Sequence, residues 1–245
     1  MKLVIITALW GRHQISSACL SFMSTVKPEG VEVVGLAVGS EGATSRAIAE
    51  EAGFRYIEHP NRPLGRKWNA VSREAQKYDP DALMVLGSDD VVNTKYVEGA
   101  MEVIRNGADY TCITNGYMYD WTTGYLIFLK ANVVIGSGRV FSRRLCDMLD
   151  WELWSDDREQ TMDADTDLRI RQRFPESDGF VFEPCLVGDI LIVKEQSTDD
   201  GDGENIWSFQ HVARRTVWLP AKFEDVDQSF PGLFAHDGMS WLDSD

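Results

Sequence analysis

The chain has 245 residues, of which 44% are hydrophobic and 26% are charged, and its formal net charge is −15. This composition is ordinary for a soluble globular protein that buries a core. The acidic balance argues against non-specific binding to nucleic acid or to anionic membranes, because phosphate contacts need clustered Lys and Arg, but it leaves room for a local basic pocket.

Residues 1–92 alternate between apolar strands and amphipathic helices. We expect strands at 2–9, 31–38, 54–59 and 82–86, and helices at 13–26, 44–53 and 65–78. Strands rich in Val, Ile and Leu that alternate with helices predict parallel pairing with right-handed crossovers. The sequence therefore predicts an α/β fold with a mostly parallel central sheet flanked by helices. Ligands of such sheets bind beyond the carboxyl ends of the strands.

Beyond residue 92 the pattern changes. We expect a helix at about 94–106, strands at 109–114, 124–129 and 137–141, helices at about 142–150 and 166–174, and strands near 179–183 and 187–193. Segment 197–206 is acidic and contains Gly, which is typical of a mobile loop that closes over a bound ligand. Because no repeat or linker divides the chain, we expect one domain over residues 1–245, with a first part to about 92, a second to about 195, and a loop and C-terminal tail at about 196–245.

Cysteine spacing and hydrophobic runs bear on the location of the protein. The four cysteines, Cys19, Cys112, Cys146 and Cys185, form no CxxC pair, which favours reduced thiols over a zinc site or a disulfide framework. The N-terminal MKLVIITALWG lacks a small-residue cleavage site and is typical of a first strand rather than of a signal peptide. No run of about 18 apolar residues occurs, so we expect no membrane span and a cytoplasmic location.

Two adjacent aspartates follow the fourth expected strand. In LMVLGSDDVV, residues 83–92, a Gly-Ser turn separates the apolar run from Asp89 and Asp90. Neighbouring carboxylates repel each other unless a positive group lies beside them. Two interpretations remain open: a solvated turn in which one Asp caps the next helix, or a divalent-cation site, since Mg²⁺ and Mn²⁺ prefer oxygen ligands.

The segment NRPLGRKWNA, residues 61–70, is locally positive. It places Arg62, Arg66 and Lys67 around Gly65 at the start of a helix, and helix N-termini bind anions. The alternative is a solvated start of a basic helix, but the neighbouring carboxylate pair favours phosphate binding. Neither the P-loop pattern nor GxGxxG is present, which argues against the usual kinase, GTPase and dinucleotide-binding arrangements.

A second acidic group occurs in TMDADTDLRIR, where Asp163, Asp165 and Asp167 alternate at the entry to a helix. One of them is expected to be the N-cap. A carboxylate near a helix N-terminus also stays ionised at neutral pH and is a candidate general base. The residues alone leave both roles open.

Taken in order, these motifs resemble a known family. The segments TALWGR, NRPLGRKWNAV, LGSDDVV, GSGRVFSRRL and DADTDLRIR resemble the nucleotide-sugar glycosyltransferases of the GT-A fold, in particular the large family 2 type, over about residues 1–175. The resemblance implies metal-dependent transfer of a sugar from a nucleoside diphosphate sugar, first of all a UDP-sugar, to an acceptor hydroxyl with inversion. It also implies that the donor binds to residues 1–92 and the acceptor to residues 93–195.

The resemblance implies roles for individual residues. Asp165 is expected to be the catalytic base, and Asp90, with Asp89 beside it, is expected to hold Mn²⁺ or Mg²⁺ against the donor diphosphate. His211 is the candidate for a third metal ligand, with His236 as second choice. The residues expected to bind the donor are Thr7, Ala8, Arg12, Ser40, Glu41, Gly65, Lys67, Asn69 and Asp89.

The sequence departs from the family pattern at three places. Gly87 stands where the first Asp of the DxD-type motif is usual, and Ala164 replaces the Glu of the ED pair. The turn Gly39-Ser40-Glu41 replaces the Asp that often reads the uracil ring. The base of the nucleotide therefore stays open, with uridine first.

The acceptor and two other function classes also stay open. Aromatic faces stack on sugar rings and on unstacked bases, and six aromatics of the second part are candidates: Tyr117, Tyr119, Trp121, Tyr125, Trp151 and Trp154. The acidic balance favours a glycan acceptor over a modified DNA base. A sugar nucleotidyltransferase normally needs a Gly-rich loop after the first strand, where TALWGRHQ has only Gly11. A non-catalytic sugar-binding module would not need both the aspartate pair and Asp165.

Overall fold

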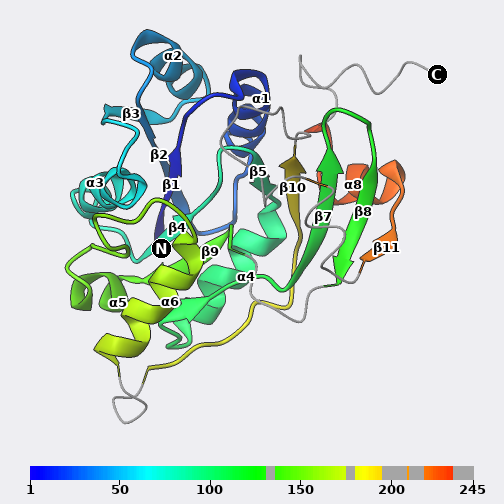
Figure 1. Ribbon diagram of the computed structural model, residues 1–245. Helices are drawn as coiled ribbons and strands as arrows, with labels where there is room; N and C mark the ends of the chain where they lie inside the picture. Colours follow the sequence, from blue (N-terminus) through cyan, green and yellow to red (C-terminus); the bar gives the residue numbers. More distant parts are fainter. Residues whose placement is uncertain (131–135, 175–179, 195–208, 210–217, 234–245) are drawn as a thin grey trace.

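Two neighbouring sheets organise the computed structural model, which describes residues 1–130, 136–174, 180–194, 209 and 218–233 (Figure 1). The larger sheet has six strands in the order β3-β2-β1-β4-β9-β6. Its strands are β1 (Lys2–Ala8), β2 (Glu32–Gly39), β3 (Arg55–Glu58), β4 (Ala82–Val85), β6 (Tyr110–Thr111) and β9 (Arg139–Ser142). The first four strands pair in parallel, while β9 runs antiparallel to both β4 and β6.

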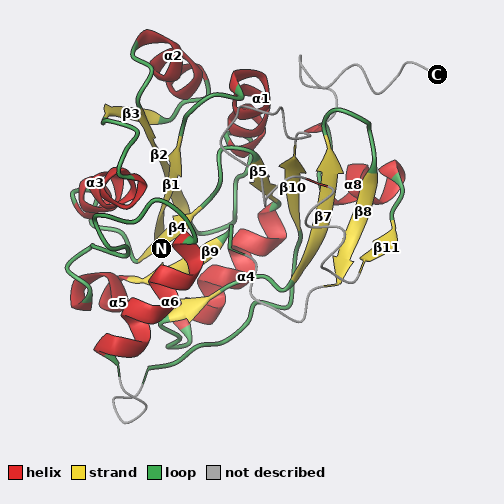
Figure 2. Ribbon diagram, viewed as in Figure 1, coloured by secondary structure: helices red, strands yellow, loops and turns green. Residues whose placement is uncertain are grey.

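Helices cover both faces of this sheet (Figure 2). They are α1 (His13–Met23), α2 (Ala43–Glu51), α3 (Leu64–Gln76), α4 (Thr94–Arg105), α5 (Arg143–Met148) and α6 (Met162–Arg173). Side chains of β1 alternate between the faces, so that Leu3 and Ile5 join the core under α1, α2 and α4, whereas Val4 and Ile6 join the core under α3, α5 and α6. Burial on both faces explains why β1 is apolar from Leu3 to Ile6.

The second sheet has five strands in the order β11-β8-β7-β10-β5. They are β5 (Asp90–Val92), β7 (Asn115–Asp120), β8 (Leu126–Lys130), β10 (Ile190–Lys194) and β11 (Trp218–Pro220), and α8 (Phe223–Ser229) packs beside them. Strand β10 pairs antiparallel with β5 and parallel with β7. The ring of Phe230, just after α8, lies 5.9 Å from that of Phe22 in α1, which ties this sheet to the larger one.

The predicted α/β fold with a mostly parallel central sheet is confirmed, and β1 to β4 lie where the periodicity predicts them. Strand β7 was not predicted, because its alternating Tyr and Met side chains lie in a segment that we expected to be a connection. The strand expected at 179–183 is wrong for the part that the structure describes, where Phe182 makes only an isolated bridge to Tyr110. Helix α6 begins at Met162, earlier than the predicted residue 166.

Among the described residues, none of the helices combines the length and the apolar character needed to span a bilayer. The expected loop at 197–206 and both candidate ligands His211 and His236 lie outside the described residues.

Candidate active site

The loops that follow β1, β2 and β4 meet at the carboxyl edge of the larger sheet. Leu9 N–H donates to Val38 O (2.8 Å), and Leu86 N–H donates to Ile6 O (3.0 Å), so the three strand ends are hydrogen-bonded to one another. This is the edge at which ligands of parallel sheets bind. The sequence-predicted donor residues Thr7, Ala8, Ser40 and Asp89 all lie at it.

Asp89 is buried at this edge and is paired with two cations. Its Oδ2 atom accepts hydrogen bonds from Arg12 Nη1 (2.5 Å) and from Lys194 Nζ (2.9 Å). Burial raises the pKa of Asp89, but the charges of Lys194 and Arg12 outweigh burial and lower it to about 2. Asp89 is therefore a carboxylate whose charge is already balanced within the protein.

Asp90 lies beside Asp89 in a different environment. Burial, together with the neighbouring Asp89 charge, raises the pKa of Asp90 to about 6. Its Oδ1 atom is buried and has no hydrogen-bond partner among the described residues, and Lys194 Nζ is 4.0 Å away. A Cβ on Gly87 would lie 2.3 Å from Asp90 Oδ2, so the turn needs glycine where the family pattern has an aspartate.

Strand β10 brings Lys194 to the aspartate pair. Ile192 is the register partner of Asp90, and Val193 N–H donates to Asp89 O (2.9 Å). These backbone bonds place Lys194, the last residue of β10, against Asp89. Burial lowers the pKa of Lys194, but the charges of Asp89 and Asp90 outweigh it, so that the pKa is raised and the side chain is a fixed cation. Sequence reasoning missed this residue, because no motif surrounds it.

Glu41 positions the loop that carries Arg12. Its Oε2 atom accepts hydrogen bonds from Gly11 N–H (3.0 Å) and Ser45 Oγ (3.3 Å), and lies 3.0 Å from His13 Nε2. Arg12 has a left-handed backbone, with φ 44°, at the start of α1, and this turn directs its side chain to Asp89. Glu41 thus helps to orient the Arg12 side chain toward Asp89.

Lys67 lies beneath the same edge, fully buried in α3. Its Nζ atom donates to Leu9 O (2.7 Å), Asn61 Oδ1 (2.9 Å) and Ser40 Oγ (3.2 Å). An ammonium has three N–H donors, so all of them are used within the protein. Burial lowers the pKa of Lys67 to about 8, against the opposing effect of Glu41 and Glu58. The structure places Lys67 as a connector of three loops.

Gly65 and Asn69 connect α3 to the loop at 154–158. Gly65 N–H donates to Arg158 O (2.7 Å), and a Cβ on Gly65 would lie only 2.0 Å from Ser155 O. Asn69 Nδ2 donates to Trp154 O (2.7 Å), and Trp154 N–H donates back to Asn69 Oδ1 (3.2 Å). Both residues therefore hold the loop that contacts Asp165.

Asp165 is buried in the first turns of α6 and is held by Ser155. Ser155 N–H donates to Asp165 Oδ2 (2.6 Å) and Ser155 Oγ donates to Asp165 Oδ1 (3.0 Å), while Arg158 Nε lies 3.6 Å from Oδ1. The N-cap of α6 is Thr161, so the prediction that one of the three aspartates caps this helix is wrong. The early start of α6 explains the difference, because it moves all three aspartates inside the helix.

Asp163 contacts the turn next to Asp90. A Cβ on Gly136 would lie 2.0 Å from Asp163 Oδ2, and the adjacent Ser137 Oγ accepts a hydrogen bond from Gly87 N–H (2.9 Å). Burial raises the pKa of Asp163, while Arg139 opposes the rise. The structure thus links Asp163 to the aspartate pair through one turn, which the sequence spacing did not reveal.

The arginine of β9 organises the start of α6. Arg139 is buried, and its Nη1 atom donates to Asp163 O and to Asp167 Oδ1, both at 3.1 Å. Asp167 therefore has a structural ion pair.

The candidate acceptor aromatics divide by burial. Tyr119, Trp151 and Trp154 belong to the core, with at most 3% of their surface exposed. Tyr125 is 61% exposed, and Tyr117 and Trp121 are partly buried. Only these last three are accessible for stacking on a ligand.

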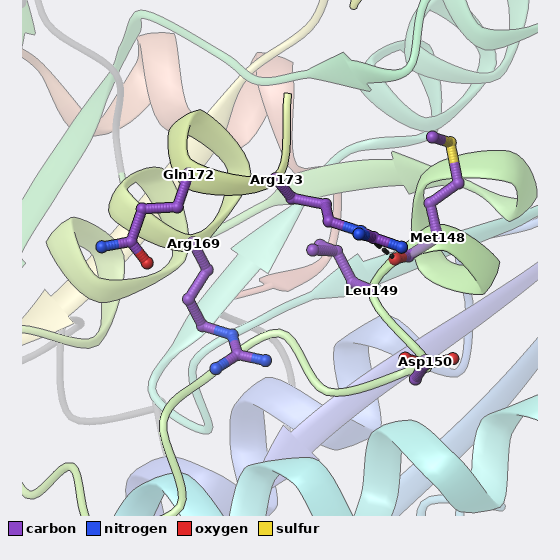
Figure 3. A pocket seen from close by; sticks show the side chains of 6 residues that line it. All are labelled: Met148, Leu149, Asp150, Arg169, Gln172 and Arg173. Atoms are coloured by element: carbon purple, nitrogen blue, oxygen red, sulfur yellow. Dashed lines mark hydrogen bonds between the residues drawn. The ribbon is translucent and has the colours of Figure 1, made fainter. Parts of the chain in front are cut away.

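A separate cavity of about 250 Å³ lies between α5 and α6 (Figure 3). Its lining residues are Met148, Leu149, Asp150, Arg169, Gln172 and Arg173. Arg173 Nε donates to Met148 O (3.3 Å), and Arg169 Nε donates to Glu152 O (3.1 Å). The α6 residues that line this cavity are in the C-terminal half of the helix, whereas Asp163 and Asp165 are in its first turns. The cavity is therefore distinct from the candidate active site.

A divalent metal ion at this edge would need several oxygen ligands from the protein. Within the described ranges, no group of three or more His, Cys, Asp or Glu side chains is arranged to hold an ion. The Oδ2 atom of Asp89 is already paired with two cations, and the buried Oδ1 atom of Asp90 has no hydrogen-bond partner among the described residues. Mg²⁺ and Mn²⁺ need several oxygen ligands, so the described residues do not fit a resident ion at this edge.

No protein-family model matches the sequence, and no curated protein matches it. Solved structures match the fold. TarS 1–349 from S. aureus in complex with UDP-GlcNAc has a TM-score of 0.57 at 12% identity, over 83% of this chain and 61% of that one. TarS 1–349 in complex with UDP has a TM-score of 0.57 at 11% identity, over 79% and 60%. This chain thus spans about three-fifths of the TarS structures that it matches.

A second protein gives a similar result over more of the chain. The mannosyltransferase PcManGT from Pyrobaculum calidifontis, in complex with GDP-Man and Mn²⁺, has a TM-score of 0.55 at 11% identity, over 97% of this chain and 72% of that one. Likeness at this identity shows the fold. The chain therefore has the GT-A fold, as the resemblance of its motifs predicts.

Proposed function

We propose that the protein is a glycosyltransferase that moves a sugar from a nucleoside diphosphate sugar to an acceptor hydroxyl. The observation that carries this proposal is the polar edge where β1 and β4 end, with Arg12 and Lys194 held against Asp89. Cations at the carboxyl edge of a parallel sheet suit a diphosphate. The fold supports the proposal, because the matched structures hold UDP, UDP-GlcNAc and GDP-Man.

In this proposal residues 1–92 bind the donor, and a UDP-sugar is the first candidate. Arg12 is the reachable cation, since 39% of its side chain is exposed. Thr7, Ala8 and Ser40 line the strand ends. Four further residues act indirectly by holding the loops in place: Glu41, Gly65, Lys67 and Asn69.

The proposed reaction is a displacement with inversion. The acceptor oxygen attacks the anomeric carbon on the face opposite the diphosphate, which leaves with the electron pair of the glycosidic bond. The partly exposed Arg12 guanidinium offsets the negative charge that the diphosphate gains, while Lys194 balances the aspartate pair. A carboxylate takes the proton of the acceptor hydroxyl, a contribution that is typically about 10²–10⁴-fold in rate.

Two aspartates are candidates for that proton acceptor. The resemblance assigns the role to Asp165, whose two carboxylate oxygens both accept hydrogen bonds from Ser155. The geometry adds Asp163, which lies against the turn that contacts Asp90. Separate substitutions of the two residues decide between them.

Dependence on Mn²⁺ or Mg²⁺ stays a prediction from the resemblance, in which Asp90 and Asp89 are ligands together with His211. The matched mannosyltransferase is in complex with Mn²⁺. Because the described residues do not fit a resident ion, the proposed displacement uses only the protein's own cations.

The acceptor is proposed to be a glycan bound by the part of the chain from residue 93 to about 195. Tyr117, Trp121 and Tyr125 provide accessible aromatic faces there. The net charge of −15 disfavours DNA with a modified base. A cytoplasmic location is proposed from the unpaired cysteines, all four of which are buried and free.

A thermal-shift panel tests the donor proposal. Nucleoside diphosphates and their sugars are added with and without Mn²⁺, and a ligand at 100 times its Kd should stabilise the fold by about 2.7 kcal/mol. Release of UDP or GDP from the stabilising sugar nucleotide, measured with a set of glycan acceptors, then tests catalysis. If no nucleotide raises the melting temperature, the proposal is wrong.

The products that the protein forms from each set of substrates separate the rival classes of function. A sugar nucleotidyltransferase would form a sugar nucleotide from a nucleoside triphosphate and a sugar phosphate, with release of pyrophosphate. A sugar-binding module would bind glycan without releasing nucleotide from any donor.

A further inference from the structure

Three side chains form an ion cluster at the end of β10, in which Asp89 is buried and Arg12 is partly exposed. Arg12 and Lys194 both donate to the same oxygen of Asp89, at 2.5 Å and 2.9 Å. The formal charges of Arg12, Lys194, Asp89 and Asp90 sum to zero when both aspartates are ionised. The aspartate pair is thus neutralised without any added ion.

The backbone determines the position of the Lys194 ammonium. On one side, the end of β10 is held by β5. Ile192 pairs in register with Asp90, and Val193 N–H donates to Asp89 O. On the other side Trp121 N–H donates to Lys194 O (2.7 Å). Only 14% of the Lys194 side chain is exposed, so the ammonium has little room to leave Asp89.

The Lys194 ammonium opposes a divalent ion at either aspartate. A metal ion bound by Asp89 would compete with Lys194 for the same oxygen, and one bound by Asp90 alone would lie close to a like charge. Moving Lys194 away would leave a buried ammonium without its partner, which is strongly unfavourable. The cluster therefore opposes metal binding at the place where the resemblance expects it.

We propose that the Arg12–Asp89–Lys194 cluster takes the place of a divalent ion: Arg12 contacts the donor diphosphate, Lys194 neutralises the aspartate pair, and nucleotide binding does not require a metal. This inference rests on the proposed function, since it concerns the same donor. Arg12 is suited to the contact because a guanidinium binds phosphate oxygens with paired hydrogen bonds.

Isothermal titration of the full chain with UDP, and separately with GDP, tests the inference. The wild-type protein should bind the preferred nucleotide with the same Kd, within about threefold, in excess EDTA and in Mn²⁺. Tighter binding by about tenfold or more on addition of Mn²⁺ would overturn the inference while leaving the proposed function standing. Absence of binding in both buffers would overturn both.

The substitution Lys194→Met removes the charge and keeps the length of the side chain. In EDTA it should weaken nucleotide binding by about tenfold, because the aspartate pair is then no longer neutralised by Lys194 and repels the diphosphate. In Mn²⁺ the variant should regain affinity, because without Lys194 the two aspartates keep only Arg12 as a cation and carry a net negative charge that attracts the ion. The exposed Lys95→Met is the matched control and should bind as the wild type does.

Mn²⁺ titration without nucleotide gives a second readout, and circular dichroism shows whether Lys194→Met folds. The wild type should show no saturable Mn²⁺ binding, whereas a folded Lys194→Met should bind Mn²⁺. Saturable Mn²⁺ binding to the wild type would overturn the inference even if the variant does not fold.

Discussion

The acidic residues of the candidate active site form two groups that are held in different ways. At the strand edge, Asp89 is held by cations that lie 77 and 105 positions away in the chain, Arg12 and Lys194. At the start of α6, Asp165 accepts its hydrogen bonds from the neutral donors of Ser155, only 10 positions away, and the nearest cation among the described residues, Arg158, lies 3.6 Å off. The first group is assembled by tertiary structure and balanced by charge, whereas the second depends on a local loop.

This difference predicts that the two groups respond differently to substitution. Removing charge at the strand edge should unbalance buried ions and cost stability. Removing charge at α6 should leave the fold largely intact and change the chemistry.

The largest effect is expected for catalysis at α6. Asp165→Asn should lower the rate of sugar transfer by about 10²–10⁴-fold and leave the Kd for UDP unchanged, because the variant loses a proton acceptor and no cation. The rate of nucleotide release with acceptor and the Kd from titration are the two measurements. Asp163→Asn is the companion variant. If Asp163→Asn loses activity while Asp165→Asn retains most of it, the base is Asp163.

The next effect is on stability at the strand edge. Asp89→Asn leaves the Lys194 ammonium and the Arg12 guanidinium beside a neutral amide, so the free energy of unfolding should fall by about 3–5 kcal/mol. Urea denaturation measures this loss. The exposed Asp157→Asn is the control, expected within about 0.5 kcal/mol of the wild type. A loss for Asp89→Asn as small as that of the control would contradict the charge-balanced cluster.

A smaller effect is expected where neutral donors hold Asp165. Ser155→Ala removes the hydroxyl and keeps the backbone N–H, so unfolding should become easier by about 1 kcal/mol. The same denaturation experiment applies. If Ser155→Ala lowers the free energy of unfolding as much as Asp89→Asn does, the two groups of acidic residues do not differ in the way described.

The last prediction concerns pH. The pKa of Asp90 is raised to about 6 in the fold, so its contribution to stability is present below the unfolded pKa of 3.8 and is lost as pH rises through about 6. The pKa of Asp89 is lowered to about 2, so its contribution is present above 3.8 and is lost on acidification. Relative to Asp90→Asn, the wild type should lose stability between pH 4 and pH 6. The measurement is the free energy of unfolding of both proteins across this range. If the wild type does not lose stability relative to Asp90→Asn between pH 4 and pH 6, the raised pKa of Asp90 is wrong.

The sequence was sufficient to predict the parallel part of the fold. Val, Ile and Leu runs separated by amphipathic segments predict β1 to β4 and the helices between them, because both faces of the sheet are buried. Parallel strand ends also predict that Thr7, Ser40 and Asp89 lie at one edge, and the structure places them there.

The rest depends on contacts that leave no local signal. Lys194 is an ordinary lysine at the end of an apolar run, and its role follows only from the register of β10 with β5. The contact of Asp163 with the turn at Gly136 likewise needs the early start of α6. Sequence spacing shows which carboxylates are near one another in the chain, but not which cations face them.

Lys67 has a consequence for how binding is communicated within the edge. One ammonium holds Leu9, Ser40 and Asn61, which belong to the loops after β1, after β2 and before α3. If the proposed nucleotide contacts one of these loops, the shared ammonium should transmit the restraint to the other two, so that base recognition at one loop and phosphate recognition at another would be coupled. Amide hydrogen exchange in the three loops should slow together on nucleotide addition, and independently of one another in Lys67→Met.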